Sequence, residues 1–277
     1  MAGRGLIGAL MLTAAWLVAA NGAHAFDEAK YPNLKGQWQR IGDDRWDPGK
    51  PAGAAPLTAE YRATYEANLK ILKDGGQGTD PTLTCLSPGM PRIMNVYAPM
   101  EIVVTPETTH ILIEHVHDTR RIHTDGRSWP GEVDESFRGY SIGRWIDQDG
   151  DGRFDVLEVE TRSMKGPRTL DSSGLPLHSD NETVVKERIY LDKADANVLH
   201  DEITVIDHAF TAPWTVLKSY RRDQVRQPAW RESICAEGNN HVAVGKEDYV
   251  VGPDGLLMPT RKDQPPPDLR YFKPVRK

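Results

Sequence analysis

The sequence predicts a mainly β fold, an antiparallel meander that closes into a barrel or folds into a sandwich. From Met100 onward, polar and apolar residues alternate with period two over more than half of the remaining chain. Turns rich in Gly, Pro and Asp separate these runs at short intervals, as sequential strands joined by hairpins require. Helical periodicity is confined to one segment near residues 58–73.

The expected strands are short, and several have mixed faces. In Leu199–Asp207, the carboxylate of Asp201 falls on the same face as Leu199 and Ile203. Such faces fit a barrel interior that holds charged groups, and they fit equally well a flat sheet with ion pairs outside. The expected strands are Met100–Thr105, His110–His117, Arg120–Thr124, Ser141–Ile146, Phe154–Thr161, Thr183–Leu191, Leu199–Asp207 and Trp214–Arg221.

The single expected helix has a start signal, an apolar stripe and a stop signal. Thr58 can cap its first turn, and Asp74-Gly75-Gly76 ends it. Between them, apolar residues recur at spacings of three and four: Tyr61, Tyr65, Leu69 and Leu72. We expect this stripe to pack on a sheet.

The N-terminal 25 residues are typical of a secretory signal. A basic Arg4 precedes a short apolar run, and Ala23-His24-Ala25 forms an A-x-A exit. Cleavage after Ala25 would leave a mature chain in the periplasm or outside the cell, without membrane insertion; an uncleaved anchor is the alternative. We expect one β-rich domain over residues 26–262 and an extended tail over 263–277, where prolines cluster.

Charge and motifs exclude several classes of function. The chain of 277 residues has a formal net charge of −6, which argues against nucleic acid or an anionic membrane surface as a partner. A phosphate-binding glycine loop, a G-x-S-x-G elbow and an H-E-x-x-H motif are all missing from the sequence. We therefore expect no nucleotide cofactor.

Two cysteines, Cys85 and Cys235, lie in the part expected to be exported. An even count in an oxidising compartment suggests one disulfide, and two buried free thiols are the alternative.

Acidic residues are concentrated in one turn, between the two expected strands of Tyr140–Arg162. Gly152 stands at position 6 of this turn, counted from Asp147. Positions 1, 3, 5, 9 and 12 carry oxygen ligands in the order of a calcium loop, and the position-7 carbonyl can add another. The expected Ca²⁺ ligands are Asp147, Asp149, Asp151, Arg153, Asp155 and Glu158. The flanking strands depart from the helices of an EF-hand, Glu158 is the least certain to reach the ion, and a solvated acidic turn is the alternative.

A pair of histidines, His115 and His117, lies two residues apart on an expected strand, so both imidazoles would point to one side. A transition metal is one interpretation of such a pair. A cavity wall or a hydrogen-bonded strand end is the other. Arg121 and His123 would extend the same polar face.

Two charged pairs, Glu187-Arg188 and Asp201-Glu202, fall on adjacent expected strands. Cross-strand ion pairs are the simpler interpretation. Alternatively, Arg188 or Arg121 points into the barrel and binds an anion, because a guanidinium matches a carboxylate bidentately.

A set of strings spread over the chain resembles a known group of proteins. The strings are PGMPRIM, RRIHTDGR followed by Trp-Pro, YSIGRW, KERIYL, DEITVID and APWTV. In this order they resemble a broad group of exported bacterial β-rich proteins without an established activity, and the resemblance covers Gly36–Phe272. It implies a secreted or periplasmic β domain, and it implies that the acidic turn is a local elaboration. Gly36-Gln37-Trp38 is also similar to the first strand of lipocalins.

Three functions remain open from the sequence. The first is binding of a small, partly apolar, carboxylate-bearing molecule in a cavity lined by Tyr140, Trp145, Arg188 and Trp214. The second is a cofactor-independent lyase, isomerase or hydrolase that uses a histidine and a carboxylate. Its candidate residues are His115, His117, Arg121 and Glu202. The third is a structural module of the cell envelope whose interior is filled by side chains.

Overall fold

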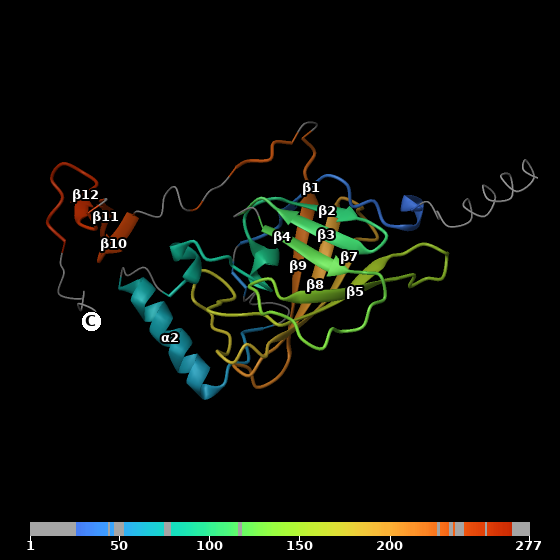
Figure 1. Cartoon of the computed structure of the whole chain (residues 1–277), viewed down its shortest axis with the longest axis horizontal. Coiled ribbons are helices and arrows are strands. Elements are labelled where there is room, and N and C mark those ends of the chain that lie inside the picture. Colours follow the sequence, from blue (N-terminus) through green and yellow to red (C-terminus); the bar gives the residue numbers. More distant parts are fainter. Residues whose placement is uncertain are drawn as a thin grey trace, which may run out of the picture.

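Nine strands of the described chain close into a barrel (Figure 1). The computed structural model describes residues 26–43, 45–46, 53–74, 79–115, 118–225, 228–232, 235, 241–252 and 254–267. The barrel strands are β1 (Gln37–Arg40), β2 (Met100–Val104), β3 (Thr108–Ile113), β4 (Asp118–His123), β5 (Tyr140–Ile146), β6 (Val156–Arg162), β7 (Val184–Leu191), β8 (Val198–Ile206) and β9 (Trp214–Arg222). They follow one another in chain order, and β1 closes the ring by pairing with both β2 and β9. The predicted mainly β fold is confirmed, as a barrel.

One pair of strands departs from the antiparallel meander. β4 and β5 run parallel, with Ile122 opposite Ser141, whereas the other barrel pairs are antiparallel. A parallel pair needs a long connection, because the chain must return to the end where the first strand began. Residues 124–139 provide this connection.

Alternation along the strands sorts side chains between the interior and the outer face. On β8, Leu199, Asp201 and Ile203 are buried, while Glu202 between them is exposed. The prediction that charged and apolar side chains share an inward face is therefore confirmed for this strand.

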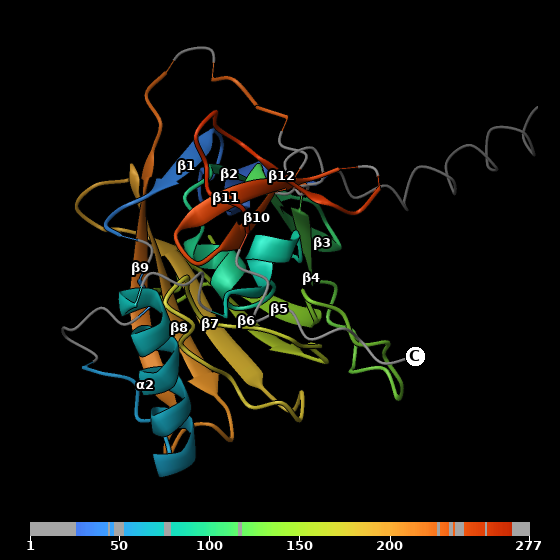
Figure 2. The same cartoon turned by 90° about the vertical axis from the view of Figure 1, so that its left-hand side faces the viewer.

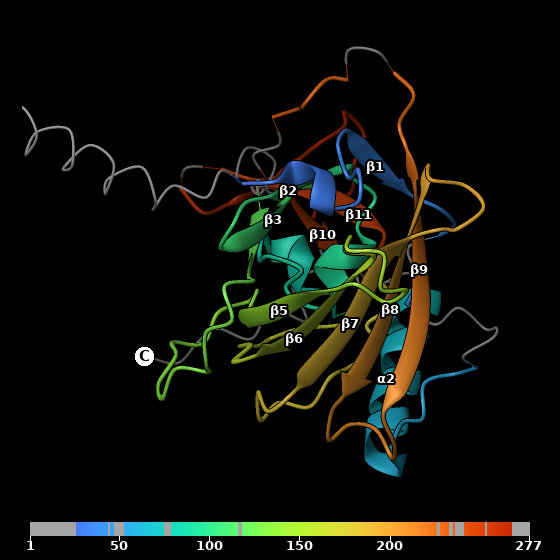
Figure 3. The same ribbon diagram turned by 90° about the vertical axis from the view of Figure 1, so that its right-hand side faces the viewer.

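The interior is filled by side chains from the strands and from the segment that precedes β2. Met90, Ile93 and Met94, around the short helix η3 (Arg92–Asn95), are at most 2% exposed and belong to the same apolar cluster as the inward-facing strand residues. Figures 2 and 3 show this segment against the inner side of the strands. The Tyr220 hydroxyl on β9 donates to the Met94 carbonyl, which fixes the segment to the wall.

The expected helix is α2 (Ala59–Lys73). The Thr58 hydroxyl accepts a hydrogen bond from the Tyr61 amide at 3.4 Å, as its capping role predicts. Tyr61 and Tyr65 pack against the apolar cluster. The Tyr65 hydroxyl lies 2.9 Å from the Ser173 hydroxyl and the Asn68 amide donates to the Gly174 carbonyl at 2.8 Å, so α2 packs on the loop before β7 and not directly on the sheet as expected. Among the described helices, none combines the length and apolarity that a membrane span needs.

The strand expected over His110–His117 is wrong at its C-terminal end. β3 ends at Ile113, and the chain turns at Glu114 and His115 before β4 begins at Asp118. The alternation of Ile111, Ile113 and His115 continues past the strand, which explains why the pattern concealed the turn. His117 lies outside the described residues.

A second sheet follows the barrel. It has three antiparallel strands, β10 (His241–Val244), β11 (Glu247–Val251) and β12 (Leu257–Pro259). The Tyr249 hydroxyl donates to the Pro265 carbonyl at 2.7 Å, so the first described residues of the tail lie along this sheet. The signal segment, residues 1–25, and the end of the tail, from residue 268, lie outside the described residues.

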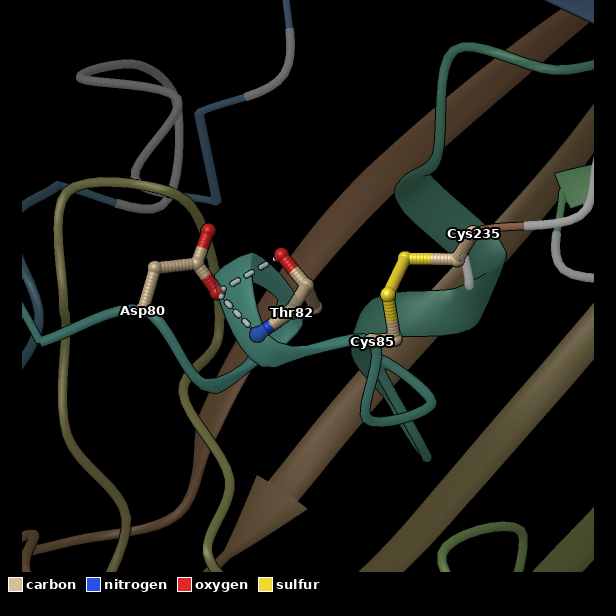
Figure 4. The surroundings of a disulfide bond; sticks show 4 residues. All are labelled: Asp80, Thr82, Cys85 and Cys235. Carbon is tan, nitrogen blue, oxygen red and sulfur yellow. Dashed lines mark hydrogen bonds between the residues drawn. A yellow bond between two sulfur atoms is a disulfide. The ribbon is translucent and has the colours of Figure 1, made fainter. Parts of the chain in front are cut away.

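The predicted disulfide is present and joins Cys85 to Cys235, 150 residues apart (Figure 4). Cys85 follows the short helix η2 (Pro81–Thr84), whose first turn is capped by Asp80. One Asp80 oxygen accepts hydrogen bonds from the Thr82 amide at 3.0 Å and the Thr82 hydroxyl at 2.9 Å. Arg92 binds both Asp80 oxygens, so this end of the disulfide is held to the segment that fills the barrel.

Candidate functional site

The barrel interior holds a buried ion pair between strands that are not neighbours. Arg120 on β4 donates to both carboxylate oxygens of Glu187 on β7, through Nη1 at 2.7 Å and through Nη2. Nη2 also lies 3.0 Å from the Thr161 hydroxyl. Arg120 is 1% exposed and Glu187 2%. Because each charge has its partner inside the barrel, we interpret this ion pair as a structural link between β4 and β7.

A second carboxyl, Asp201, lies beside this pair, and no ion pair joins it to a cation of the described residues. Among the described residues, no hydrogen-bond donor reaches either Asp201 oxygen. Complete burial and the neighbouring Glu187 carboxylate raise the pKa of Asp201 well above its ordinary value. Burial beside Glu187 therefore favours the protonated form of Asp201 over its carboxylate.

On β4 the arginine that points into the barrel is Arg120, whereas the sequence suggested Arg121 or, on β7, Arg188. Arg121 is exposed on the outer face of β4, and Arg188 is exposed on the outer face of β7. The turn after β3 restarts the alternation at Asp118, which places even-numbered residues of β4 inward. The idea of an internal anion clamp at Arg121 or Arg188 is therefore wrong.

The outer faces of β5 to β8 carry two hollows, which together we call the outer groove. The narrower hollow encloses about 570 Å³ and the wider one about 960 Å³. Both are bordered by Arg188 and Glu202, so they meet there. The narrower hollow also has Arg127, Ile142, Arg144 and Lys186 in its lining. The wider one has Phe154, Tyr190, Asp192 and His200, together with the acidic turn.

A ladder of alternating charges crosses the floor of the outer groove. Strand register places Arg144, Glu158, Arg188 and Glu202 opposite one another on successive strands. Arg144 binds Glu158 at 2.7 Å, and Arg188 Nε lies 3.8 Å from the other Glu158 oxygen. Cross-strand ion pairs therefore form on this face, but they join β5 and β7 to Glu158 of β6. Among the described residues, no ion pair joins Arg188 to Glu202, although the simpler interpretation expected one, and Glu187 and Asp201 are on the opposite side of the sheet.

Three aromatic residues expected to line a ligand cavity are absent from the lining of both hollows. Trp214 is buried in the core, with its ring at the edge of Phe210. The Trp145 indole donates to the Thr109 hydroxyl at 3.2 Å. Tyr140 accepts a hydrogen bond from Arg127 at 3.3 Å; Arg127 lines the narrower hollow, but Tyr140 does not.

The histidine expected to act with Arg121 and Glu202 is not close to them in the sheet. His115 follows β3 and packs against Tyr97, with ring centroids 5.2 Å apart. Burial and the nearby Arg92 lower the pKa of His115. Arg121 is on β4 and Glu202 on β8, with three strands between them in the sheet order. The described residues therefore do not assemble this constellation.

The acidic turn is held by its own backbone amides. Asp147 accepts hydrogen bonds from the Gly150 amide at 2.7 Å and the Gly152 amide at 2.9 Å. Oxygens of Asp147, Asp149 and Asp151 lie within 4.8 Å of one another. The other expected ligands are arranged differently: the Asp155 side chain accepts from the Gln148 amide, and Glu158 binds Arg144.

A histidine and a carboxylate that the sequence analysis missed do meet in the wider hollow. His200 Nε2 lies 3.0 Å from Asp192 Oδ2, and His200 Nδ1 lies 2.8 Å from the Ser219 hydroxyl. The Tyr190 ring packs on the imidazole at 5.4 Å. Hydrogen bonds to His200 contribute to a lowered pKa of Asp192. The feature that could have predicted this contact is the register of the β7–β8 hairpin, which places Tyr190 opposite His200 and Asp192 beside them.

No protein-family model matches the chain, and no curated protein is significantly similar to it. The candidate site is thus defined by its own geometry, as a groove on the outer face of a filled nine-stranded barrel.

Proposed function

We propose that this protein binds a small, partly apolar, carboxylate-bearing molecule in the outer groove, with Arg188 as the anchor of the carboxylate. The observation that carries the proposal is the meeting of the two hollows at Arg188 and Glu202. A ligand seated there would lie between polar and apolar walls, as small-molecule sites usually require. Such a site replaces the internal cavity that the sequence suggested.

The Arg188 guanidinium has N–H groups that can donate hydrogen bonds to a ligand. Its side chain is 46% exposed, and its Nη2 donates to the Gln148 amide oxygen at 3.2 Å. The 3.8 Å separation from Glu158 is too long for a strong hydrogen bond. A guanidinium has five N–H donors in a planar fork, which suits bidentate binding of a carboxylate.

The apolar part of the ligand would pack on the groove walls. Ile142 borders the narrower hollow, and Phe154 and Tyr190 border the wider one. Glu202 at the junction would accept a hydrogen bond from a hydroxyl or amine of the ligand and would repel a second carboxylate. The preferred ligand therefore carries a single acidic group.

The test uses hexanoate, decanoate and 4-phenylbutyrate as probes for binding to the mature protein by calorimetry. Loss of a charged hydrogen bond costs about 1.5–3 kcal/mol, so Arg188→Ala should weaken binding by at least about tenfold. 1-Hexanol, which lacks the carboxylate, should bind much more weakly than hexanoate.

The matched control is Arg221→Ala. Arg221 is likewise exposed on an outer strand face and pairs with Asp195 at 3.3 Å, but it does not border the groove. Its loss should leave binding unchanged. Equal weakening by both substitutions, or no binding of any probe by the wild type, would contradict the proposal.

A second candidate function is hydrolysis at the same groove. The specific observation is the hydrogen-bonded series Asp192, His200 and Ser219, of which the first two border the wider hollow. In this arrangement Asp192 would orient the imidazole, and His200 would accept a proton from water or a hydroxyl that attacks an ester.

Turnover of 4-nitrophenyl butyrate tests this candidate. His200→Ala should abolish it while the melting temperature changes little, and His110→Ala, which removes a half-exposed imidazole from β3, should retain it. Absence of turnover in the wild type, or full activity in His200→Ala, would contradict hydrolysis and leave ligand binding as the proposed function.

We further propose that the protein is exported, and that it is related to the exported bacterial proteins that its motifs resemble. The Cys85–Cys235 disulfide supports export, because such bonds persist in oxidising compartments. Calcium in the acidic turn is the proposed ion. The three clustered carboxylates Asp147, Asp149 and Asp151 support it, with Asp155 and the Arg153 carbonyl as further oxygens.

A further inference from the structure

A second group of potential metal ligands lies away from the outer groove, in two loops near α2. His178 and Asp180 belong to the loop before β7, and His208 follows β8. Asp180 Oδ2 is 2.9 Å from His178 Nδ1 and 2.5 Å from His208 Nδ1. One ligand atom from each of the three residues lies within 4.8 Å of the other two.

The two loops are fixed to each other by a buried carboxylate, Asp207. Its Oδ1 accepts hydrogen bonds from the His178 amide and the Ala209 amide, both at 2.8 Å. Its Oδ2 accepts from the Thr183 hydroxyl at 2.6 Å. Since these amides belong to His178 and to the residue after His208, one carboxylate sets the spacing of the two histidines.

Aromatic contacts restrict the imidazole rings. The Tyr61 ring of α2 packs on His178 with centroids 5.2 Å apart, and His208 meets His178 edge to face at 5.6 Å. His178 is about one-third exposed, whereas His208 is open to solvent. An ion can therefore enter from the His208 side.

We propose that His178, Asp180 and His208 bind a divalent transition-metal ion of the Zn²⁺ type. Two imidazole nitrogens and one carboxylate oxygen form a donor set that suits Zn²⁺ and Co²⁺ better than Ca²⁺ or Mg²⁺. Water would complete the coordination, because three protein ligands leave a fourth position open. Glu182 Oε2, 3.9 Å from His208 Nδ1, is the nearest additional carboxylate in the described part of the chain.

The Asp180 oxygen already lies near both imidazole nitrogens at close to the spacing that a bound ion requires. With metal–ligand bonds of about 2.0–2.1 Å, tetrahedral ligand atoms lie about 3.3 Å apart. The present separations of 2.9 and 2.5 Å must therefore open by less than about 1 Å. Binding also replaces the hydrogen bond of 3.2 Å from the Asp180 amide to His178 Nδ1.

The experiment is calorimetric titration of the mature protein, stripped with chelator and returned to chelator-free buffer, with ZnCl₂. One Zn²⁺ should bind per chain, and Co²⁺ should bind with visible absorption of a four- or five-coordinate site. Asp180→Asn and His208→Ala should each weaken Zn²⁺ by about tenfold or more. His208 is exposed and Asn is isosteric with Asp, so both variants should fold.

Two control variants make the result specific. His241 forms a similar exposed pair with Asp248 at 2.7 Å on the second sheet, so His241→Ala tests whether any histidine–carboxylate pair suffices. Asp149→Asn tests whether the ion binds in the acidic turn instead. Both should bind Zn²⁺ as the wild type does. No Zn²⁺ binding by the wild type, unchanged affinity in Asp180→Asn and His208→Ala, or loss in either control would overturn the proposal.

Discussion

At the scale of single residues, Asp201 is the most unusual group in the barrel. Its carboxyl is fully buried beside a carboxylate that already has an arginine partner. Ionising it would place a second negative charge next to Glu187 in a medium of low polarity. The fold therefore holds a proton on Asp201 under conditions where the unfolded chain has lost it.

This proton makes stability depend on pH in a predictable direction. Because the folded pKa of Asp201 is raised, its contribution is fully present below the unfolded value of about 3.9 and is lost as pH rises toward the folded pKa. The wild type should thus lose up to about 1.4 kcal/mol per pH unit relative to Asp201→Asn, in which the amide replaces the proton donor.

Urea unfolding at pH 4, 5, 6 and 7 measures the difference between the two proteins. Glu202→Gln, next in sequence but exposed on the outer face, controls for the loss of one negative charge. A constant difference between wild type and Asp201→Asn over this range would mean that Asp201 is ionised in the fold.

At the scale of elements, the strands and the helix followed from local patterns, whereas the site did not. Alternation located β5 to β9 to within about two residues, and the Thr58 cap located α2. The turn at His115 was missed because Ile111, Ile113 and His115 continue the strand pattern beyond the strand. As a result, the sequence pattern predicted that Arg121 faces inward on β4, whereas the residue that faces inward is its neighbour Arg120.

The groups that now define candidate sites depend on contacts between elements. Ser219, His200 and Asp192 meet because β7, β8 and β9 pair in one register. His178 and His208 meet because Asp207 holds two loops together. Neither arrangement follows from a local sequence pattern, so the periodicity of polar and apolar residues along the chain does not predict it.

The hairpin of β5 and β6 carries the calcium prediction. If Ca²⁺ binds the folded turn alone, it stabilises the protein by about 2.7 kcal/mol at a hundredfold excess over Kd. Metal-stripped wild type should therefore melt at a higher temperature in millimolar Ca²⁺ than in chelator, and Mg²⁺ should substitute poorly. Asp149→Ala combined with Asp151→Ala should remove the difference.

Because Glu158 is paired with Arg144, Glu158→Gln should leave the calcium effect largely intact. Identical melting curves of the wild type in Ca²⁺ and in chelator would show that the turn is only an acidic hairpin.

At the scale of the whole molecule, the disulfide is the longest-range covalent constraint. It closes a loop with a sequence separation of 150 residues, which on the chain-entropy model stabilises the fold by about 4–5 kcal/mol. Cys85→Ser combined with Cys235→Ser should lower the free energy of unfolding by up to this amount. Guanidinium unfolding with and without reductant measures it.

Reductant should have no effect on the double variant, which lacks the bond. If reductant leaves the wild type equally stable, the disulfide constrains the native and unfolded chains alike and adds nothing to stability.

The barrel as a whole has a filled interior and a hollowed outer face, and this division is the basis of the proposed function. Met90, Ile93 and Met94 occupy the inside, while Arg188 and Glu202 join two hollows outside. The most direct test is a crystal structure of the protein soaked with whichever carboxylate probe binds most tightly. The account predicts density for the ligand on the outer face of β7, with its carboxylate on the Arg188 guanidinium. A ligand found inside the barrel, in place of the η3 segment, would contradict it.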